Sequence, residues 1–227
     1  MKSNIFLRFI TSCMFLLVFT NCRAADLSPK EALNFAETKG KELLMAFQEP
    51  DLVARYAKLD DMVKQYVDID YVSKFVIGKY WRQMSAKQKQ DYQDLFLRYG
   101  LAFYKTLPLD YAKNIKYKIK GSEYDGKFVT VSAIVSVDLG GDEYQDVMLV
   151  FRLHKVDNII KAVDVKVAES SLLLSYRSKF YEMIAQNDGE IDWFLEDLGD
   201  LTSTLEKSLE QNVSTQQKSL EFGDKTI

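Results

Sequence analysis

Apolar residues recur every three or four positions through the first half of the chain, which is the spacing of amphipathic helices. The pattern predicts helices over residues 28–48, 51–66, 69–77 and 85–107. Ser28 before Pro29 marks the first start, and Ser85 with Gln88 forms a capping box at the last. The apolar stripe of the last helix is largely aromatic: Tyr92, Phe96, Tyr99, Phe103 and Leu107.

After Asn114 the apolar period changes to two, the pattern of strands with one buried face. Four such strands are separated by turn signals at residues 124–126, 140–142 and 156–158, which predicts an antiparallel meander. Helical spacing returns over residues 172–184 and 191–209, with Gly199 as a potential break. From Gln211 the sequence is polar and aperiodic, so we expect disorder there.

This order of elements predicts an α+β fold, with a curved antiparallel sheet of about four strands packed against N- and C-terminal helices. A sheet with one apolar face must be covered by helices. Where those helices do not pack directly onto the sheet, they enclose an apolar pocket. We expect residues 1–24 to be a signal peptide, residues 25–198 the α+β domain, and residues 199–227 a helical extension with a disordered tail.

The first 24 residues have the layout of a secretory signal peptide. Lys2 and Arg8 give a positive start, and residues 9–20 form an apolar run that is too short to span a bilayer comfortably. We expect cleavage near Ala24 and a periplasmic mature protein. An uncleaved anchor and lipidation of Cys22 are the alternatives.

Cysteine content and net charge exclude several classes of function. Cys13 and Cys22 both lie in the leader, so the mature chain has no disulfide, thiol nucleophile or thiolate metal site. Removing the leader takes away three cations and no acid, which lowers the net charge from −3 to −6. Nucleic acid requires a basic face, so we expect no nucleic-acid partner, and we expect no cofactor or metal.

Candidate catalytic residues are few. His154 is the single histidine and has no second histidine or cysteine with which to share a metal ion. Asp164 lies in an otherwise apolar strand, and a carboxylate in an apolar pocket can act as a base when burial raises its pKa. The alternation of that strand instead places Asp164 opposite its flanking valines, which favours a structural role.

An ordered set of short segments resembles the MlaC-type family, also called the toluene-tolerance family. The segments are Phe75–Arg82 with Ser85 and Gln88, then Phe96 and Tyr104, then Asp164–Val167, and finally Ser171-Leu172 followed by Tyr176–Phe180. The resemblance runs from about Ser28 to Leu198. The chain departs from the family at Glu169-Ser170, where a glycine is usual, at Lys161–Val163, where a tryptophan is common, and beyond Gly199.

The resemblance implies a soluble periplasmic phospholipid carrier. Such carriers shuttle lipid between an outer-membrane lipoprotein complex and an inner-membrane ABC transporter, and thereby maintain outer-membrane lipid asymmetry. They hold the acyl chains between a curved sheet and helices. A diacyl lipid has on the order of 30 methylenes, so its transfer through water costs about 25 kcal/mol, and a carrier removes that cost without covalent chemistry. We therefore expect that the protein is not an enzyme.

The faces of the predicted elements nominate the pocket residues. The expected lipid-binding residues are Val76, Tyr80, Phe96, Phe103, Val131, Val135, Leu149, Val165, Leu173, Tyr176 and Phe180. We expect Arg177 at the pocket mouth or near the head group, with a salt bridge to an acid as its alternative role.

Three other functions remain open. A carboxylate-based enzyme with a conical apolar pocket predicts turnover and an acid inside the cavity. A carrier of lipidated proteins or of another apolar ligand predicts a similar pocket with different cargo. A structural envelope module predicts a filled core.

Overall fold

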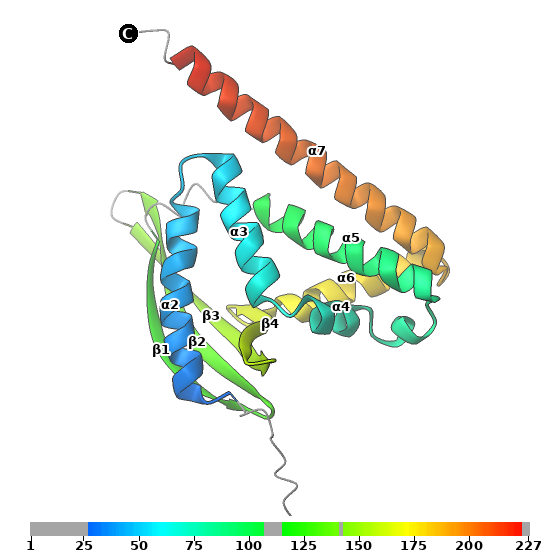
Figure 1. Ribbon diagram of the computed structural model, residues 1–227, viewed down its shortest axis with the longest axis horizontal. Helices are drawn as coiled ribbons and strands as arrows, with labels where there is room; N and C mark the ends of the chain where they lie inside the picture. The colour runs from blue at the N-terminus through cyan, green and yellow to red at the C-terminus, as the bar shows by residue number, and fades with distance from the viewer. Residues whose placement is uncertain (1–26, 107–114, 141–142, 224–227) are drawn as a thin grey trace, which may run out of the picture.

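The computed structural model describes residues 27–106, 115–140 and 143–223 (Figure 1). The expected signal peptide therefore lies outside the described residues. The helices are α2 (Pro29–Phe47), α3 (Leu52–Tyr66), α4 (Ile69–Ile77), α5 (Ala86–Lys105), α6 (Leu172–Gln186) and α7 (Ile191–Gly223), with a short 3-10 helix η1 (Gly78–Arg82). The strands are β1 (Lys116–Asp125), β2 (Phe128–Gly140), β3 (Glu143–Val156), β4 (Ile159–Val167) and β5 (Ser170–Ser171).

The sheet is a curved, unclosed antiparallel meander in the order β1-β2-β3-β4-β5, which confirms the α+β prediction and adds a two-residue fifth strand. In β2 and β3, Val131 pairs with Phe151 and Val135 with Val147, so alternate side chains form one inner apolar face. The edge strand β1 has a register shift between Ile119 and Gly121. Figure 1 shows α2 lying over the inner face of the sheet and the remaining helices beyond it.

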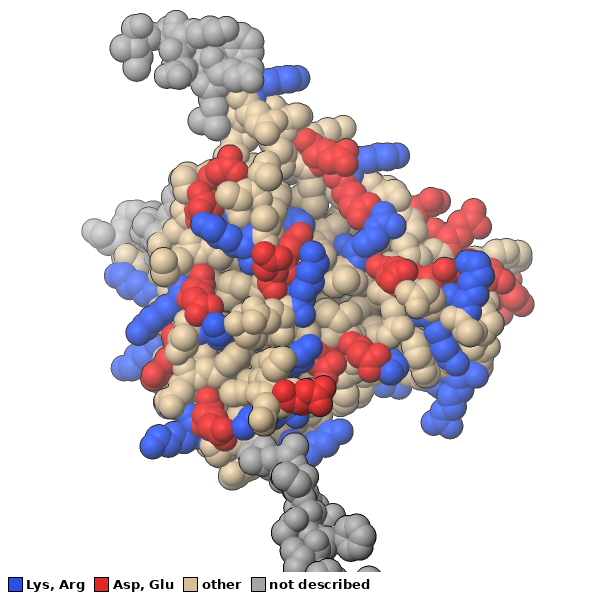
Figure 2. Space-filling model, in the orientation of Figure 1, with Lys and Arg blue, Asp and Glu red and all other residues tan. Residues whose placement is uncertain are grey.

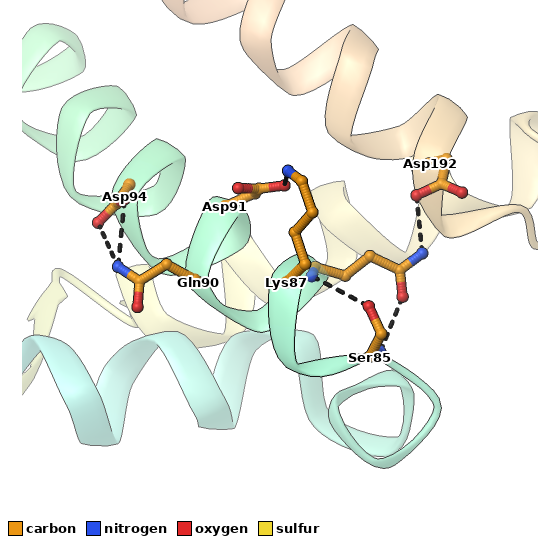
Figure 3. A network of polar contacts seen from close by, with 7 residues as sticks. Ser85, Lys87, Gln90, Asp91, Asp94 and Asp192 are labelled. Carbon is orange, nitrogen blue, oxygen red and sulfur yellow. Dashed lines mark hydrogen bonds and ion pairs between the residues drawn. The ribbon is translucent and has the colours of Figure 1, made fainter.

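The helix starts follow from local capping. Ser28 and Ser85 both form capping boxes, of which the sequence predicts the one at Ser85 and only a helix start at Ser28. Asp51, Asp68 and Ser171 cap α3, α4 and α6. Gln88 also reaches across to α7, where its amide donates to Asp192 at 2.7 Å. Figure 3 shows Ser85 and Asp192 on either side of this bridge, which ties the first turn of α5 to that of α7.

Two separate hydrophobic cores support the molecule. One lies among α4, α5, α6 and α7 and is centred on the fully buried rings of Tyr92, Tyr99, Phe180 and Phe194. The other is smaller and lies where α2 meets the sheet, around Ala32, Val129, Val131 and Leu153. The helical core is therefore complete without the sheet's inner face, most of which is left to α2 and α3.

The helix α7 is longer than the sequence pattern predicts. Gly199 does not interrupt it, and the helix continues through Gln211 to Gly223. Its buried residues up to Leu209 include Leu195, Leu198 and Thr202, which lie on the face toward α5. The division into a domain at residues 25–198 and an extension beyond it remains a prediction.

Candidate functional site

An apolar cavity of about 430 Å³ lies between the inner face of the sheet and the pair α2 and α3. The sheet contributes alternate side chains from four strands, among them Ile119, Val131, Ala133, Val135, Leu149, Phe151 and Val165. The helices contribute Phe35, Ala36, Gly40, Leu43, Leu44 and Phe47 from α2, and Leu59, Met62 and Val63 from α3. Volumes of this size are typical of small-ligand sites.

Small residues on α2 set how closely that helix approaches the sheet. A Cβ added at Gly40 would lie 3.2 Å from the ring of Tyr117 on β1. The Tyr117 hydroxyl donates to the Glu37 carbonyl of α2 at 3.2 Å. Gly40 therefore lets this tyrosine lie against α2 and close one side of the cavity.

The polar groups that border the cavity are occupied by protein partners. The Lys39 ammonium binds Glu42 at 2.8 Å and lies 4.7 Å from the centre of the Tyr66 ring, and its hydrogen bond to Glu42 raises the pKa of Lys39. Tyr104 donates to Asp60, and burial raises its pKa far above the ordinary tyrosine value. The cavity therefore presents hydrocarbon and ring surface to its contents.

The structure brings four of the nominated pocket residues together. Val131, Val135, Leu149 and Val165 all line the cavity from the sheet. Their common feature is the period-two alternation, which fixes the face of a strand from sequence alone.

The other seven nominated residues lie in or against the helical core and do not line this cavity. They are Val76, Phe96, Leu173 and Phe180, which are buried there, and Tyr80, Phe103 and Tyr176, which pack against them. The Phe180 ring lies 5.6 to 6.3 Å from the rings of Tyr92, Phe96, Tyr99 and Phe194. Because α5 and α6 bury their aromatic faces against each other, these faces are unavailable to the sheet.

The helical wall that sequence reasoning missed belongs to α2 and α3. Ala36, Gly40, Leu43 and Phe47 recur along α2 at helical spacing and were visible in the sequence as an apolar face. The periodicity identifies the face but not its partner, so it could not distinguish a cavity wall from a packed core.

Arg177 lies in α6, within the helical half of the molecule. Its guanidinium donates to the Phe75 carbonyl at 3.3 Å and to the Tyr181 hydroxyl at 3.1 Å, and it stacks on the Phe75 ring at 5.0 Å. These partners hold the turn from α4 to η1 against α6. Arg177 is not among the residues that line the cavity.

Asp164 is buried and accepts hydrogen bonds from the first residues of α6 and from its N-cap. The Ser171 hydroxyl donates at 2.7 Å and the Leu173 amide at 3.0 Å. His154 lies 2.8 Å from Asp68, at the junction of α3 and α4. Within the described ranges, no three His, Cys, Asp or Glu side chains gather as metal ligands do.

The molecular surface carries both signs of charge. Basic and acidic side chains are interspersed over most of the face in Figure 2. Among the residues that the structure describes, no helix combines the length and apolar character needed to cross a bilayer.

The fold and the site together define an α+β domain whose curved sheet and two covering helices enclose an apolar cavity. A family model described as "MlaC protein" matches residues 41–200, and the chain belongs to the MlaC family. The expected family is thereby confirmed.

A solved structure shares this fold. It is a phospholipid-binding protein from Ralstonia solanacearum in complex with a phospholipid, with a TM-score of 0.62 and 22% identity. The similarity covers 76% of this chain and 97% of that chain. No curated protein matches the chain.

Proposed function

We propose that this protein is a periplasmic phospholipid carrier that holds acyl chains in the cavity between the sheet and the pair α2 and α3. The observation that carries the proposal is an apolar cavity of about 430 Å³ in a member of the MlaC family. The phospholipid bound to the Ralstonia protein of the same fold supports the same cargo.

The chemistry of the lining supports binding without reaction. Each buried methylene contributes about 0.8 kcal/mol, so an acyl chain is held by area alone. Asp164, the acid that an enzymatic reading requires in the pocket, is occupied by Ser171 and Leu173 instead. We therefore infer a carrier that makes no covalent bond with its cargo.

The proposed lipid-binding residues are revised accordingly. Val131, Val135, Leu149 and Val165 remain, and the cavity-lining residues of α2 and α3 replace the seven residues of the helical core. We also drop Arg177 as a head-group residue, because its guanidinium binds the Phe75 carbonyl of α4 and the Tyr181 hydroxyl of α6 and does not line the cavity.

Family membership supports a proposed route of transport. We propose that the carrier exchanges lipid between an outer-membrane lipoprotein complex and an inner-membrane ABC transporter, and so helps to maintain outer-membrane lipid asymmetry. Export by a cleaved signal peptide at residues 1–24 is part of this proposal.

Mass spectrometry of organic extracts tests the cargo. The chain from residue 25 onward, purified from its host compartment without detergent, is expected to release phospholipid in stoichiometric amount. A different apolar molecule would identify a carrier with other cargo. A clean extract from well-folded protein would overturn the proposal.

A further inference from the structure

The two ends of the cavity differ in their exposure to solvent. On the inner face of the sheet, Val131 of β2 and Leu153 of β3 are 0% and 2% exposed. Further along the same face Val135 and Leu149 are partly exposed, and Val167, the partner of Leu149, is 39% exposed. Among the residues that the structure describes, the cavity is therefore closed around Val131 and Leu153 and most open toward Val167.

At the closed end, two aromatic rings fill the gap between α2 and α3. Phe35 of α2 and Tyr66 of α3 both line the cavity, and their rings meet edge to face with centroids 5.5 Å apart. Phe35 also packs against the small core around Ala32, Val131 and Leu153. A hydrocarbon tail that enters from the open end therefore meets these two rings last.

Both rings have little freedom to move. Phe35 is held by the small core, and Tyr66 is held by the attachment of α3 to the sheet. Directly after Tyr66, Val67 forms a β-bridge with Ala162 of β4, and the Asp68 amide donates to the Ala162 carbonyl at 2.9 Å. A rigid end of this kind can discriminate between tails of different length, because it does not yield to a longer one.

The depth of the cavity matches the length of an acyl chain. Gly40 lies against Tyr117, which pairs with Val135, so α2 runs from the closed end toward the open end (Figure 1). Phe35 and Phe47 line the two ends of the α2 wall, and a rise of about 1.5 Å per residue separates them by about 18 Å. A bilayer holds two layers of chains in a hydrocarbon core of about 30 Å, so one chain extends about 15 Å.

We propose that Phe35 and Tyr66 form a stop that sets the longest acyl chain the carrier accepts, with the terminal methyl group against the two rings and the polar head at the open end. This inference rests on the proposed lipid-carrying function. A methylene that leaves a vesicle for the cavity exchanges one apolar environment for another, so chains that fit should load equally well. Each methylene beyond the stop is left in water and should lower uptake about fourfold.

The test measures which chain lengths the protein takes from a mixture. Lipid-free protein is equilibrated with vesicles that contain equal amounts of phosphatidylethanolamines with two identical chains of about 12 to 20 carbons, and native mass spectrometry counts each complex. In the wild type, uptake should be even up to a limiting chain length and fall steeply beyond it. Phe35→Ala vacates the space of an aromatic ring, so the limit should move to chains about four carbons longer.

Phe47→Ala is the matched control, because it removes the same ring from the other end of the same cavity wall. A chain of any length passes this position, so the variant should lower uptake of all chain lengths alike and leave the limit where it is. A limit that moves as far in Phe47→Ala as in Phe35→Ala would overturn the stop.

Ala36→Leu tests the stop in the opposite direction without removing any core packing. Ala36 lines the cavity and packs against the same small core as Phe35, so a larger side chain there should move the limit to chains about two carbons shorter. An unchanged limit in both Phe35→Ala and Ala36→Leu, or uptake that does not depend on chain length, would overturn the stop while leaving the carrier intact. Binding of no lipid by the wild type would overturn both proposals.

Discussion

Gly78 joins α4 to η1 with a φ of +53°, in a conformation that L side chains rarely adopt. A Cβ at this position would overlap the Tyr181 hydroxyl and lie 2.9 Å from the Arg177 guanidinium. Gly78→Ala should therefore lower the free energy of unfolding by about 2–4 kcal/mol, from backbone strain and overpacking together. Urea unfolding measures this loss.

Gly100 provides the control for that substitution. It lies inside α5, and a Cβ added there would meet nothing within 4 Å. Gly100→Ala should raise the free energy of unfolding by about 0.5–1 kcal/mol through helix propensity. Similar losses in both variants would contradict the role assigned to the turn at Gly78.

Glu31 makes the docking of α2 sensitive to acid. Hydrogen bonds from Lys155 and Ser28 lower the pKa of Glu31 from 4.5 to about 2. The stabilisation is fully present above pH 4.5 and is lost as the pH falls toward 2, because the unfolded state takes up the proton first. Carboxyl chemical shifts followed by NMR should titrate near pH 2.

Glu31→Gln should remove this part of the acid dependence, so that the stabilities of variant and wild type converge as the pH falls from 4.5 to 2. A Glu31 carboxyl that titrates at its ordinary pKa would contradict the ion pair with Lys155 in solution.

At the scale of elements, neighbouring side chains of β3 face opposite sides of the sheet, one toward the cavity and the next toward solvent. Leu149 lines the cavity, whereas Met148 points outward and is 40% exposed. Leu149→Asp should abolish lipid retention, because an unpaired carboxylate would face hydrocarbon. Met148→Asp should retain lipid, and the phospholipid-to-protein ratio of purified samples checks both.

The helical core should behave independently of the cavity. Phe180 is fully buried, and Phe180→Ala should lower the free energy of unfolding by about 3–5 kcal/mol. The lipid content of the folded fraction should not change, because Phe180 does not line the cavity. A selective loss of lipid, with stability unchanged, would place Phe180 in the binding site instead.

The same elements mark what sequence could predict. The strands, the helix starts at Ser28 and Ser85, and the cavity face of Val131 and Leu149 followed from local spacing and capping. The aromatic stripe through Phe96 was assigned to the pocket because its spacing suits either a cavity or a core. Only tertiary pairing decides between them, and here α6 and α7 cover that stripe.

The full length of α7 could not be predicted from the sequence either. Residues after Gln211 are polar, and a polar helix is stabilised by contacts that its own pattern does not reveal. Gln216 supplies such a contact, with partners more than 160 positions earlier in the chain.

At the scale of the whole molecule, the two separate hydrophobic cores predict that the helical core and the cavity region unfold locally with different free energies. Removing lipid should speed amide hydrogen exchange in α2 and α3, which border the cavity, and leave α5 and α6 protected. Exchange followed by mass spectrometry, with and without lipid, measures the difference. Uniform deprotection of all four helices would instead indicate one cooperative unit.

The edge strand β1 bears on how the protein behaves in concentrated solution. Lys116, Lys118 and Lys120 are exposed along it, and its register shift distorts the hydrogen-bonding edge. A second copy approaching edge to edge would oppose two rows of ammonium groups, which repel at low ionic strength. The sheet can therefore stay open at this edge without offering a template for fibril growth.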